Sequence, residues 1–187
     1  MVNKIIALDL DSTLFPLNEL VVLPALRAAG FDVKMWDITT FDWEECLGPE
    51  VKKIAMSVYM RPDLYDGLEL SDEAIRLLDS LRRRYSRVIM VTSPFQQHAG
   101  SKWAFCQRAG FAHKDIFMCG DKALVNFDVL LDDRAETCAK IGPRRAVIFD
   151  RPWNRDLSPY FTRAYSLEDA ERKIGRAVAR QLVEVME

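Results

Sequence analysis

Two aspartates separated by a single residue, Asp9 and Asp11, directly follow the apolar run from Ile5 to Leu8. This run has the β-branched residues and the length of a buried parallel strand. Because side chains alternate along an extended strand, the two carboxylates are expected to point to the same side. Two anions this close repel each other unless a cation bridges them or one of them holds a proton. The alternative is a polar turn in which the aspartates cap a helix.

Two other apolar runs end in polar side chains in the same way. One run precedes Thr92 and Ser93, and the other precedes Asp132 and Asp133. The carboxyl ends of parallel strands lie along one edge of a sheet, where open α/β sheets bind their ligands. We therefore expect both pairs to gather beside the first two aspartates and to form a site.

The residue types at this edge favour phosphoryl transfer. Asp9 and the second aspartate pair offer only oxygen ligands, which suits Mg²⁺. Thr92 supplies a hydroxyl for an anionic oxygen, and Lys102 and Lys122, at the start of the segments that follow, add positive charge. One carboxylate in such a site can attack phosphorus, and a second can protonate the leaving oxygen and later activate water.

The composition is that of an ordinary globular chain of 187 residues, of which 49% are hydrophobic and 29% are charged. The formal net charge of -2 gives no electrostatic basis for binding a nucleic-acid polymer. The four cysteines lie far apart without a Cys-X-X-Cys pair, so we expect free thiols. No apolar run reaches the roughly 18 residues of a membrane span, and the first strand begins too early for a targeting segment. These features predict a cytoplasmic protein that does not bind membranes.

Strand patterns alternate along the chain with helical patterns, which predicts an α/β fold with a doubly wound, mainly parallel sheet. Strands are expected at residues 5–8, 87–92, 116–118, 128–131 and 145–149. Helices are expected at residues 18–29, 49–59, 72–84, 100–109 and from 167 to about 186. Pro24 should kink or restart the first helix, and Ser71 should cap the third.

Residues 18–67 lack clean strand alternation, and we expect them to form a small helical cap inserted after the first strand. The core domain would then consist of residues 1–17 and 68–187. The insert is rich in aromatic side chains, which are Trp36, Phe41, Trp43, Tyr59 and Tyr65. These aromatics either form the core of the cap itself, or one or two of them face a ligand pocket.

Taken together, the polar strand ends resemble the motifs of the haloacid dehalogenase (HAD) superfamily. Asp9-Leu10-Asp11-Ser12-Thr13 is similar to its first motif, Asp-X-Asp-X-Thr. Thr92 resembles the second motif, Lys102 the third, and Leu131-Asp132-Asp133 the acidic fourth. The resemblance implies a HAD-like, Rossmann-like core with a cap after the first motif.

Longer stretches are similar to one branch of this superfamily, the 5'(3')-deoxyribonucleotidases, including their bacterial, phage-borne and cytosolic type C members. These stretches are Val91 to Pro94, Asp121-Lys122 and Leu130 to Arg134. Phe149 to Asn154 resembles the Phe-Asp-X-Pro-aromatic-Asn stretch of the smaller members. The match covers most of the chain and is weak within the insert.

The resemblance implies a role for each residue of the expected site. Asp9 is the nucleophile and a Mg²⁺ ligand. Asp11 is the general acid and base, and its backbone carbonyl also binds the metal. Thr92 holds the transferring phosphoryl group, while Lys102 and Lys122 contact that group and stabilise its charge during catalysis.

The remaining polar residues of the expected site have less specific roles. The resemblance implies that Asp133 binds the metal directly and that Asp132 acts through water or a lysine, although the residues themselves leave that order open. Ser93 and Gln96 lie just beyond the phosphate-binding threonine. We expect Ser93 to contact the phosphate, and either residue to meet the sugar or base.

The aromatic residues of the insert and the two histidines have simpler structural roles as alternatives. Phe41 and Trp43 are expected to stack on a nucleotide base, with Trp36 behind them, unless they serve only as the core of the insert. His98 and His113 have no partner at metal-ligand spacing. We expect both histidines to be surface or helix residues without a catalytic role.

The sequence thus predicts a Mg²⁺-dependent phosphatase, a 5'-nucleotidase that releases phosphate from deoxyribonucleoside 5'-monophosphates through an aspartyl-phosphate. One alternative is a HAD phosphatase that acts on another small phosphomonoester. Another is a non-catalytic nucleotide-binding module, although the chain retains both aspartates of the first motif. The resemblance also implies a homodimer.

Overall fold

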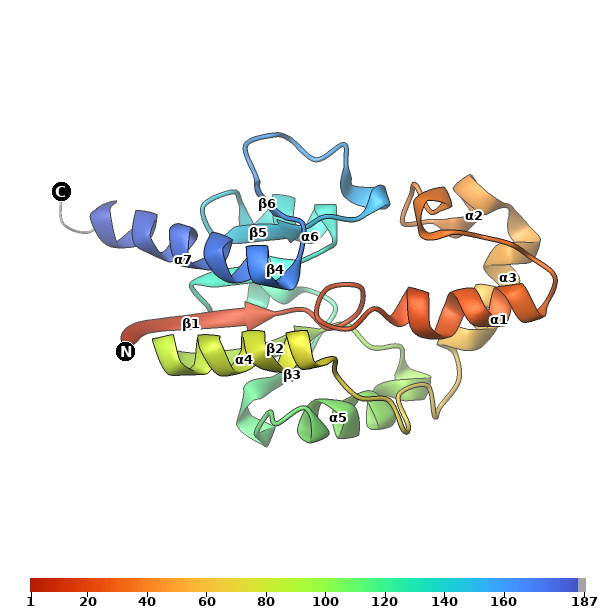
Figure 1. Cartoon of the computed structure of the whole chain (residues 1–187), viewed down its shortest axis with the longest axis horizontal. Helices are drawn as coiled ribbons and strands as arrows, with labels where there is room; N and C mark the ends of the chain where they lie inside the picture. Colours follow the sequence, from red (N-terminus) through yellow and green to blue (C-terminus); the bar gives the residue numbers. More distant parts are fainter. Residues whose placement is uncertain (185–187) are drawn as a thin grey trace.

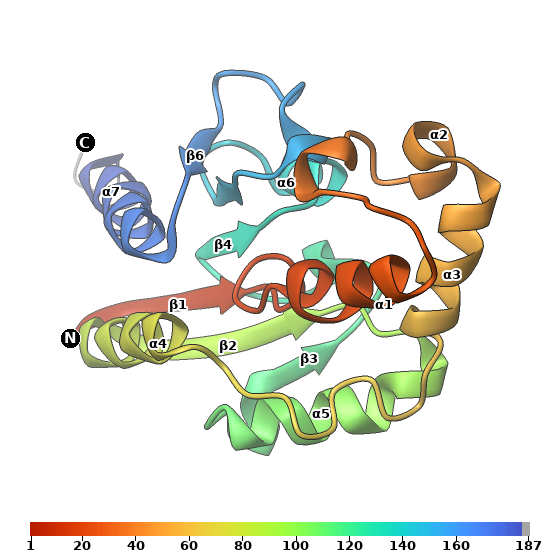
Figure 2. The ribbon, with the colours of Figure 1, turned by 45° about the vertical axis from the view of Figure 1, so that its right-hand side comes forward.

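The computed structural model describes residues 1–184 and has an α/β architecture (Figures 1 and 2). Its strands form one parallel sheet in the order β3-β2-β1-β4-β5-β6. The strands are β1 (Val2–Leu8), β2 (Tyr85–Thr92), β3 (Ile116–Met118), β4 (Val129–Asp132), β5 (Ala146–Phe149) and β6 (Thr162–Ala164). The predicted α/β class with a parallel sheet is confirmed.

Strand β1 lies at the centre of the sheet, where the strand order reverses. It pairs with β2 on one side and with β4 on the other. Ile6, Ala7 and Leu8 are completely buried, as expected for a strand covered on both faces. The point of reversal leaves a crevice beyond the carboxyl ends of these strands, which is where such sheets place their ligands.

Helices cover both faces of the sheet. Helices α4 (Asp72–Arg84) and α7 (Leu167–Glu184) pack side by side over one face, against the side of β1 that carries Ile6 and Leu8. Helix α6 (Ala135–Ile141) packs on the opposite face, against Ala146 and Ile148 of β5. Ser71 accepts a hydrogen bond from the N–H of Ala74, which confirms the predicted cap of α4.

The segment between β1 and α4 lies beyond the carboxyl ends of the strands, on the right in Figure 1. It contains a π-helical turn (Asn18–Val22) and the helices α1 (Leu23–Ala28), α2 (Trp43–Leu47) and α3 (Pro49–Tyr59). The predicted helix 18–29 is divided, because Pro24 stands in the first turn of α1. We keep the name cap for residues 18–67. The division into a cap and a core of residues 1–17 and 68–187 stays a prediction.

Several elements differ from the expectations drawn from the sequence. Strand β1 begins at Val2, and β6, α2 and α6 were not predicted. Helix α5 (Ala99–Arg108), in contrast, agrees with the helix expected at residues 100–109. The predicted end of the last helix near Met186 lies outside the described residues. Within residues 1–184 no helix is long and apolar enough to cross a membrane, and the four cysteines are free, as expected.

Candidate active site

The loop after β1 folds back on itself and fixes the first pair of aspartates. The N–H of Asp9 donates to the carbonyl of Leu131 at 2.9 Å, which ties the end of β1 to β4. Ser12 adopts a φ of 59°, in the left-handed region that non-glycine residues seldom occupy, and its N–H donates to the carbonyl of Phe15. Strained backbone of this kind is common where function demands one geometry.

Three buried carboxylates meet at the carboxyl ends of β1 and β4. Asp9, Asp132 and Asp133 each place a carboxylate oxygen within 4.8 Å of the others. The Lys122 ammonium lies between two of them, 2.5 Å from Asp9 Oδ1 and 2.7 Å from Asp132 Oδ2. The Thr13 hydroxyl donates to Asp133 Oδ1 at 3.1 Å. Asp9 therefore lies together with the second aspartate pair, whereas Asp11 is not part of this cluster.

The protein supplies too little positive charge for this cluster. Burial raises the pKa of Asp9 to about 6; Lys122 opposes the rise, and Asp132 and Asp11 add to it. Burial and the carboxylates of Asp9 and Asp132 also raise the pKa of Asp133 well above its usual value. A hard divalent cation bound by these oxygens would offset the excess negative charge.

Asp133 is oriented by the segment that follows β5. The indole N–H of Trp153 donates to Asp133 Oδ2, and the side-chain amide of Asn154 donates to the Asp133 carbonyl at 2.7 Å. The same amide donates to the carbonyl of Phe149. These contacts give a structural role to the Phe149–Asn154 stretch, which the sequence singled out without assigning a role. In metal sites, partners of this kind orient a ligand and tune its affinity.

Asp11 is held by two donors on its two carboxylate oxygens. The hydroxyl of Tyr65 donates to Oδ1 at 2.8 Å, and the ammonium of Lys102 donates to Oδ2 at 2.6 Å. Burial, together with the Asp11 carboxylate, raises the pKa of Tyr65 well above its usual value, so the phenol keeps its proton. The structure therefore brings Tyr65, which the sequence placed only among the aromatics of the insert, to the expected acid/base residue.

The position of Lys102 corrects the prediction made for it. Lys102 is completely buried, does not line the cavity and donates to Asp11 and to the carbonyl of Ser93. Lys122 lines the cavity and contacts Asp9. Lys102 thus lies too deep for the predicted contact with a phosphate, because α5 carries it behind Asp11, and the lysine beside the expected nucleophile is Lys122.

Thr92 ends β2 with an unsatisfied hydroxyl. Its Oγ1 is buried on the cavity wall and has no hydrogen-bond partner in the described part of the chain. Buried hydroxyls without a partner are rare, and one that faces a cavity indicates a place for a ligand oxygen. Ser93, the next residue, also lines the cavity and donates its hydroxyl to the carbonyl of Cys119.

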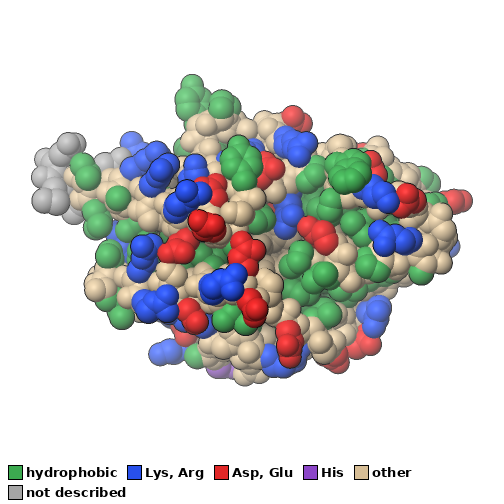
Figure 3. Space-filling view, in the orientation of Figure 1, with side chains coloured by type: hydrophobic (Ala, Val, Ile, Leu, Met, Phe, Trp, Pro, Cys, Tyr) green, Lys and Arg blue, Asp and Glu red, His purple; other side chains and the backbone are tan. Residues whose placement is uncertain are grey.

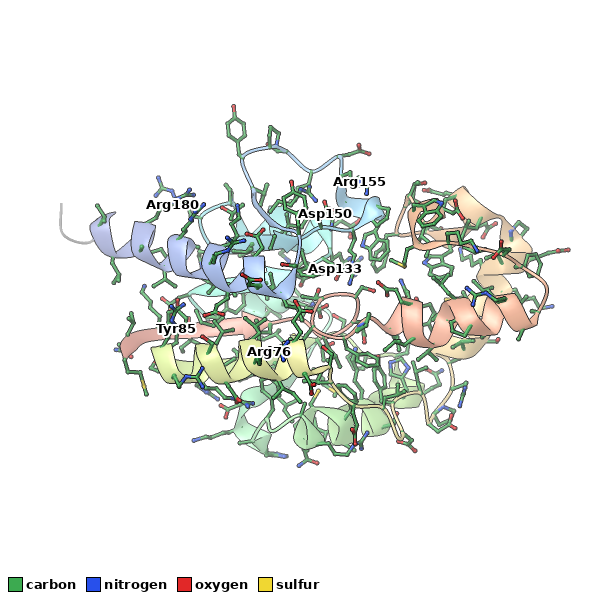
Figure 4. All side chains as sticks on the ribbon, in the orientation of Figure 1. Arg76, Tyr85, Asp133, Asp150, Arg155 and Arg180 are labelled. Carbon is green, nitrogen blue, oxygen red and sulfur yellow. The ribbon has the colours of Figure 1, made fainter. Side chains whose placement is uncertain are left out.

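These groups lie at the base of a cavity of about 350 Å³ between the sheet and the cap. The other walls carry aromatic side chains, which are Phe41, Trp43, Tyr59, Tyr65, Phe95 and Trp153. Figure 4 places Asp133 at the end of the sheet that faces the cap, and Figure 3 shows hydrophobic side chains gathered over the cap side of the same face. The cavity combines an anionic floor, whose three clustered carboxylates could hold a metal ion, with an aromatic upper part.

The predicted substrate-binding residues divide into two groups. Phe41 and Trp43 line the cavity, and the Trp43 ring also packs edge-on against Tyr59, so Trp43 belongs to the core of the cap as well. Gln96 is exposed and does not line the cavity, because the 3₁₀ turn after Phe95 carries it outward. Trp36 is 67% exposed and also lies off the cavity.

The two histidines have different surroundings. His98 ends the 3₁₀ helix Gln96–His98, so of the two predicted positions, surface or helix, it has the helical one, and its side chain is buried. Its Nδ1 lies 2.6 Å from the carbonyl of Tyr59 at the end of α3, and its Nε2 accepts from the N–H of Phe95. His113 is exposed, as expected, and its ring lies against Trp103. His98 therefore joins the cap to the loop after β2.

The sequence matches a family model described as "5' nucleotidase, deoxy (Pyrimidine), cytosolic type C protein", over residues 3–182. The chain belongs to this 5'-nucleotidase family. Membership makes it a phosphoric monoester hydrolase and confirms the resemblance inferred from the strand-end motifs. The matched range, residues 3–182, includes every residue that lines the floor of the cavity.

Individual relatives agree with the family assignment. The 5'(3')-deoxyribonucleotidases of Bacillus subtilis and of Bacillus phage SPbeta are each 24% identical to this chain over 184 residues, which cover 92% of this chain and 99% of theirs. A solved structure from Burkholderia xenovorans, classed as haloacid dehalogenase-like, has a TM-score of 0.58 and 14% identity. That comparison covers 95% of this chain and 99% of the other, and it shows a shared fold.

Proposed function

We propose that the protein hydrolyses deoxyribonucleoside 5'-monophosphates, with Asp9 as the nucleophile. The observation that carries this proposal is the unpartnered, buried hydroxyl of Thr92, which lines the same cavity as the Asp9 carboxylate. A phosphoryl group there would find an oxygen nucleophile and a donor for one of its own oxygens. The names of the relatives support a deoxynucleotide as the substrate.

Magnesium is the proposed cofactor, and the donor set fits it. Asp9, Asp132 and Asp133 offer carboxylate oxygens, and the backbone carbonyl of Asp11 is the remaining proposed protein ligand. As the family resemblance implies, Asp133 is the proposed direct ligand, and Asp132, which accepts from Lys122, is proposed to act indirectly. When bound, the metal would neutralise part of the charge that builds up on the phosphoryl oxygens.

The proposed reaction has two steps. In the first, a carboxylate oxygen of Asp9 attacks phosphorus, the bond from phosphorus to the 5' oxygen breaks, and Asp11 gives that oxygen its proton. In the second, Asp11 takes a proton from water, whose oxygen attacks phosphorus and releases phosphate from Asp9. Thr92 and Ser93 hold phosphoryl oxygens during both steps, and Lys122 stabilises their negative charge.

The cap has two proposed tasks. It excludes bulk water from the cavity, which strengthens the electrostatic interactions at the phosphate. Its aromatic side chains, Phe41 above all, bind the base by stacking. Residues of the cap as well as of the core line the cavity, and together with the near-neutral net charge this favours a single nucleotide over a polymer. A cytoplasmic location and a homodimer are further proposals, which rest on the family.

A substrate panel tests the proposal. Phosphate release is measured from deoxynucleoside and ribonucleoside 5'-monophosphates, deoxynucleoside 3'-monophosphates and sugar phosphates, each with Mg²⁺ and with EDTA. We expect release that requires Mg²⁺ and is concentrated on the deoxynucleoside 5'-monophosphates. Release from sugar phosphates alone would support a phosphatase activity but refute the proposal that the substrate is a nucleotide. Nucleotide binding without any release would instead indicate a non-catalytic module.

The role of Asp9 is tested separately by Asp9→Asn. The amide cannot attack phosphorus, so we expect activity to fall at least about 1,000-fold. The fold should persist, because the substitution removes one negative charge from the buried carboxylate cluster, in which negative charges outnumber positive ones. Asp115→Asn is the matched control, since Asp115 pairs with Arg87 away from the cavity. Full activity of Asp9→Asn would refute the assignment of the nucleophile.

A further inference from the structure

We propose that Tyr65 is a positioning residue that holds Asp11 in the orientation from which it protonates the leaving oxygen. The inference rests on the proposed function, because it takes Asp11 to be the general acid. It concerns a tyrosine that lies outside the strand-end motifs, 54 residues from its partner in the sequence.

The orientation of Asp11 requires two contacts. Lys102 contacts one carboxylate oxygen and Tyr65 the other, at 2.6 Å and 2.8 Å. A single ammonium acts as a point charge and leaves the carboxyl free to turn about its own bond. Adding the Tyr65 hydroxyl on the other oxygen removes this freedom. The Asp11 side chain nevertheless remains 29% exposed, so one edge of the carboxyl faces the cavity.

Tyr65 is rigid enough to fix its partner. The residue is completely buried, with its ring against His98 at 5.3 Å and Phe105 at 5.8 Å between centroids. Its backbone carbonyl accepts from Arg108 Nη2 at 2.8 Å, so α5 anchors the main chain as well. A donor that is already held by its surroundings loses little entropy when it orients a catalytic group.

The place of Tyr65 in the chain couples this contact to the cap. Tyr65 lies between α3 and α4, in the segment that leads from the cap back to the sheet. The orientation of Asp11 therefore depends on this return segment being seated against α5. The Tyr65 side chain thus connects the cap to Asp11, and it does so independently of the aromatic residues proposed to bind the base.

Tyr65→Phe removes the hydroxyl and keeps the buried ring. The experiment compares kcat/KM of the full chain with Mg²⁺ on two substrates, the best deoxynucleotide from the panel and 4-nitrophenyl phosphate. The 5' oxygen of a nucleotide needs a proton to leave, whereas 4-nitrophenolate leaves without one. We expect a loss of about tenfold on the nucleotide and less than about twofold on 4-nitrophenyl phosphate.

Tyr85→Phe is the matched control. Tyr85 is also buried but stands at the start of β2, at the end of the sheet opposite to the cavity (Figure 4). This variant should match the wild type on both substrates. An equal loss on both substrates in Tyr65→Phe would show a merely structural role and overturn the proposal, as would no loss on either. A wild type inactive on both would refute the proposed function itself.

A double-mutant cycle gives a second, independent measurement. If Tyr65 acts only through Asp11, its hydroxyl has nothing to position once Asp11→Asn has removed the acid. Adding Tyr65→Phe to Asp11→Asn should then change kcat/KM on the nucleotide by less than about twofold. A further tenfold loss in that background would show that Tyr65 acts independently of Asp11, and would overturn the proposal.

Discussion

The indole N–H of Trp153 donates to Asp133, with Nε1 2.9 Å from Oδ2. The two residues are 20 positions apart: Asp133 directly follows β4, and Trp153 lies in the 3₁₀ helix Pro152–Asn154 that follows β5. Thr13 donates to the other oxygen of the same carboxylate, so Asp133 is oriented from two sides. Partners of this kind govern how well a carboxylate is placed for a metal ion, without touching the ion themselves.

Trp153→Phe should weaken Mg²⁺ binding. The ring volume is largely kept and the hydrogen bond is lost, so we expect the dissociation constant for Mg²⁺ to rise about tenfold. Activity at saturating Mg²⁺ should stay close to that of the wild type. Calorimetry and Mg²⁺ titration of the activity measure the change. Trp103→Phe is the control, because Trp103 packs against His113 away from the cavity. An unchanged Mg²⁺ affinity in Trp153→Phe would contradict the assigned role.

Thr92→Val separates stability from catalysis. The Thr92 hydroxyl has no partner in residues 1–184, so its removal breaks no hydrogen bond and should leave the free energy of unfolding within about 0.5 kcal/mol of the wild type, or raise it. The phosphoryl group would lose a donor, and kcat/KM should fall about 100-fold. Thermal unfolding and steady-state kinetics test the two parts.

Thr162→Val provides the control for that substitution, since Thr162 lies on β6 and does not line the cavity. It should change neither the unfolding free energy nor kcat/KM noticeably. A Thr92→Val enzyme with wild-type kinetics would mean that the partnerless hydroxyl does not bind the phosphate.

The sequence predicted the parts of the site that lie next to a buried strand. Asp9, Thr92 and Asp132 each follow an apolar run, so strand polarity alone brings them to one edge of the sheet. The same apolar runs predicted that residues 5–8 form the central strand and that the sheet is parallel. Strand β6 escaped detection because its three residues, at the edge of the sheet, include only one that is fully buried.

The residues that the sequence misplaced depend on how helices and loops pack. Lys102 was expected on the phosphate, but the position of α5 puts its ammonium behind Asp11. Tyr65 and Trp153 reach the site from segments far along the chain, and no periodicity encodes such contacts. Trp153 had one signal, the Phe149–Asn154 stretch, whereas Tyr65 had none beyond its place in an aromatic insert.

Phe41→Ala should impair binding of the base and spare binding of the phosphate. Phe41 lines the cavity, is 59% exposed, and has the Arg134 guanidinium 4.6 Å from its ring centre. Losing a stacking surface for the base should raise KM for the nucleotide about tenfold, which corresponds to about 1.4 kcal/mol. Inhibition by inorganic phosphate should stay unchanged, because the floor of the cavity is intact.

Trp36→Ala is the matched control for the loss of an exposed aromatic from the cap. Trp36 does not line the cavity, so its removal should leave KM unchanged. Equal effects of the two variants, or a higher inhibition constant for phosphate in Phe41→Ala, would indicate that the cap as a whole had shifted.

His98 links the stability of the protein to pH. Its Nε2 accepts from the N–H of Phe95, so the ring proton lies on Nδ1 and is donated to the carbonyl of Tyr59. Burial lowers the pKa of His98, and Lys102 adds to this effect; the contact with Tyr59 and the charge of Asp11 oppose it. A second proton would break the bond to Phe95.

Because the pKa of His98 is lower in the folded protein than in the unfolded chain, its contribution to stability is fully present above the unfolded value of about 6.5. As the pH falls below that value, His98 becomes protonated in the unfolded chain but stays neutral in the folded protein. The contribution of His98 to the free energy of unfolding is then lost. The free energy of unfolding of the wild type minus that of His98→Gln should therefore shrink as the pH falls from 7.5 to 5.

Urea unfolding at a series of pH values measures this difference directly. Comparing the two proteins at each pH cancels the titration of the buried aspartates, which both contain. His113→Gln controls for replacing a histidine with glutamine, and as an exposed position it should stay within about 0.5 kcal/mol of the wild type. A difference for His98→Gln that grows on acidification would mean that His98 binds its proton more readily in the fold, contrary to its burial beneath the cap.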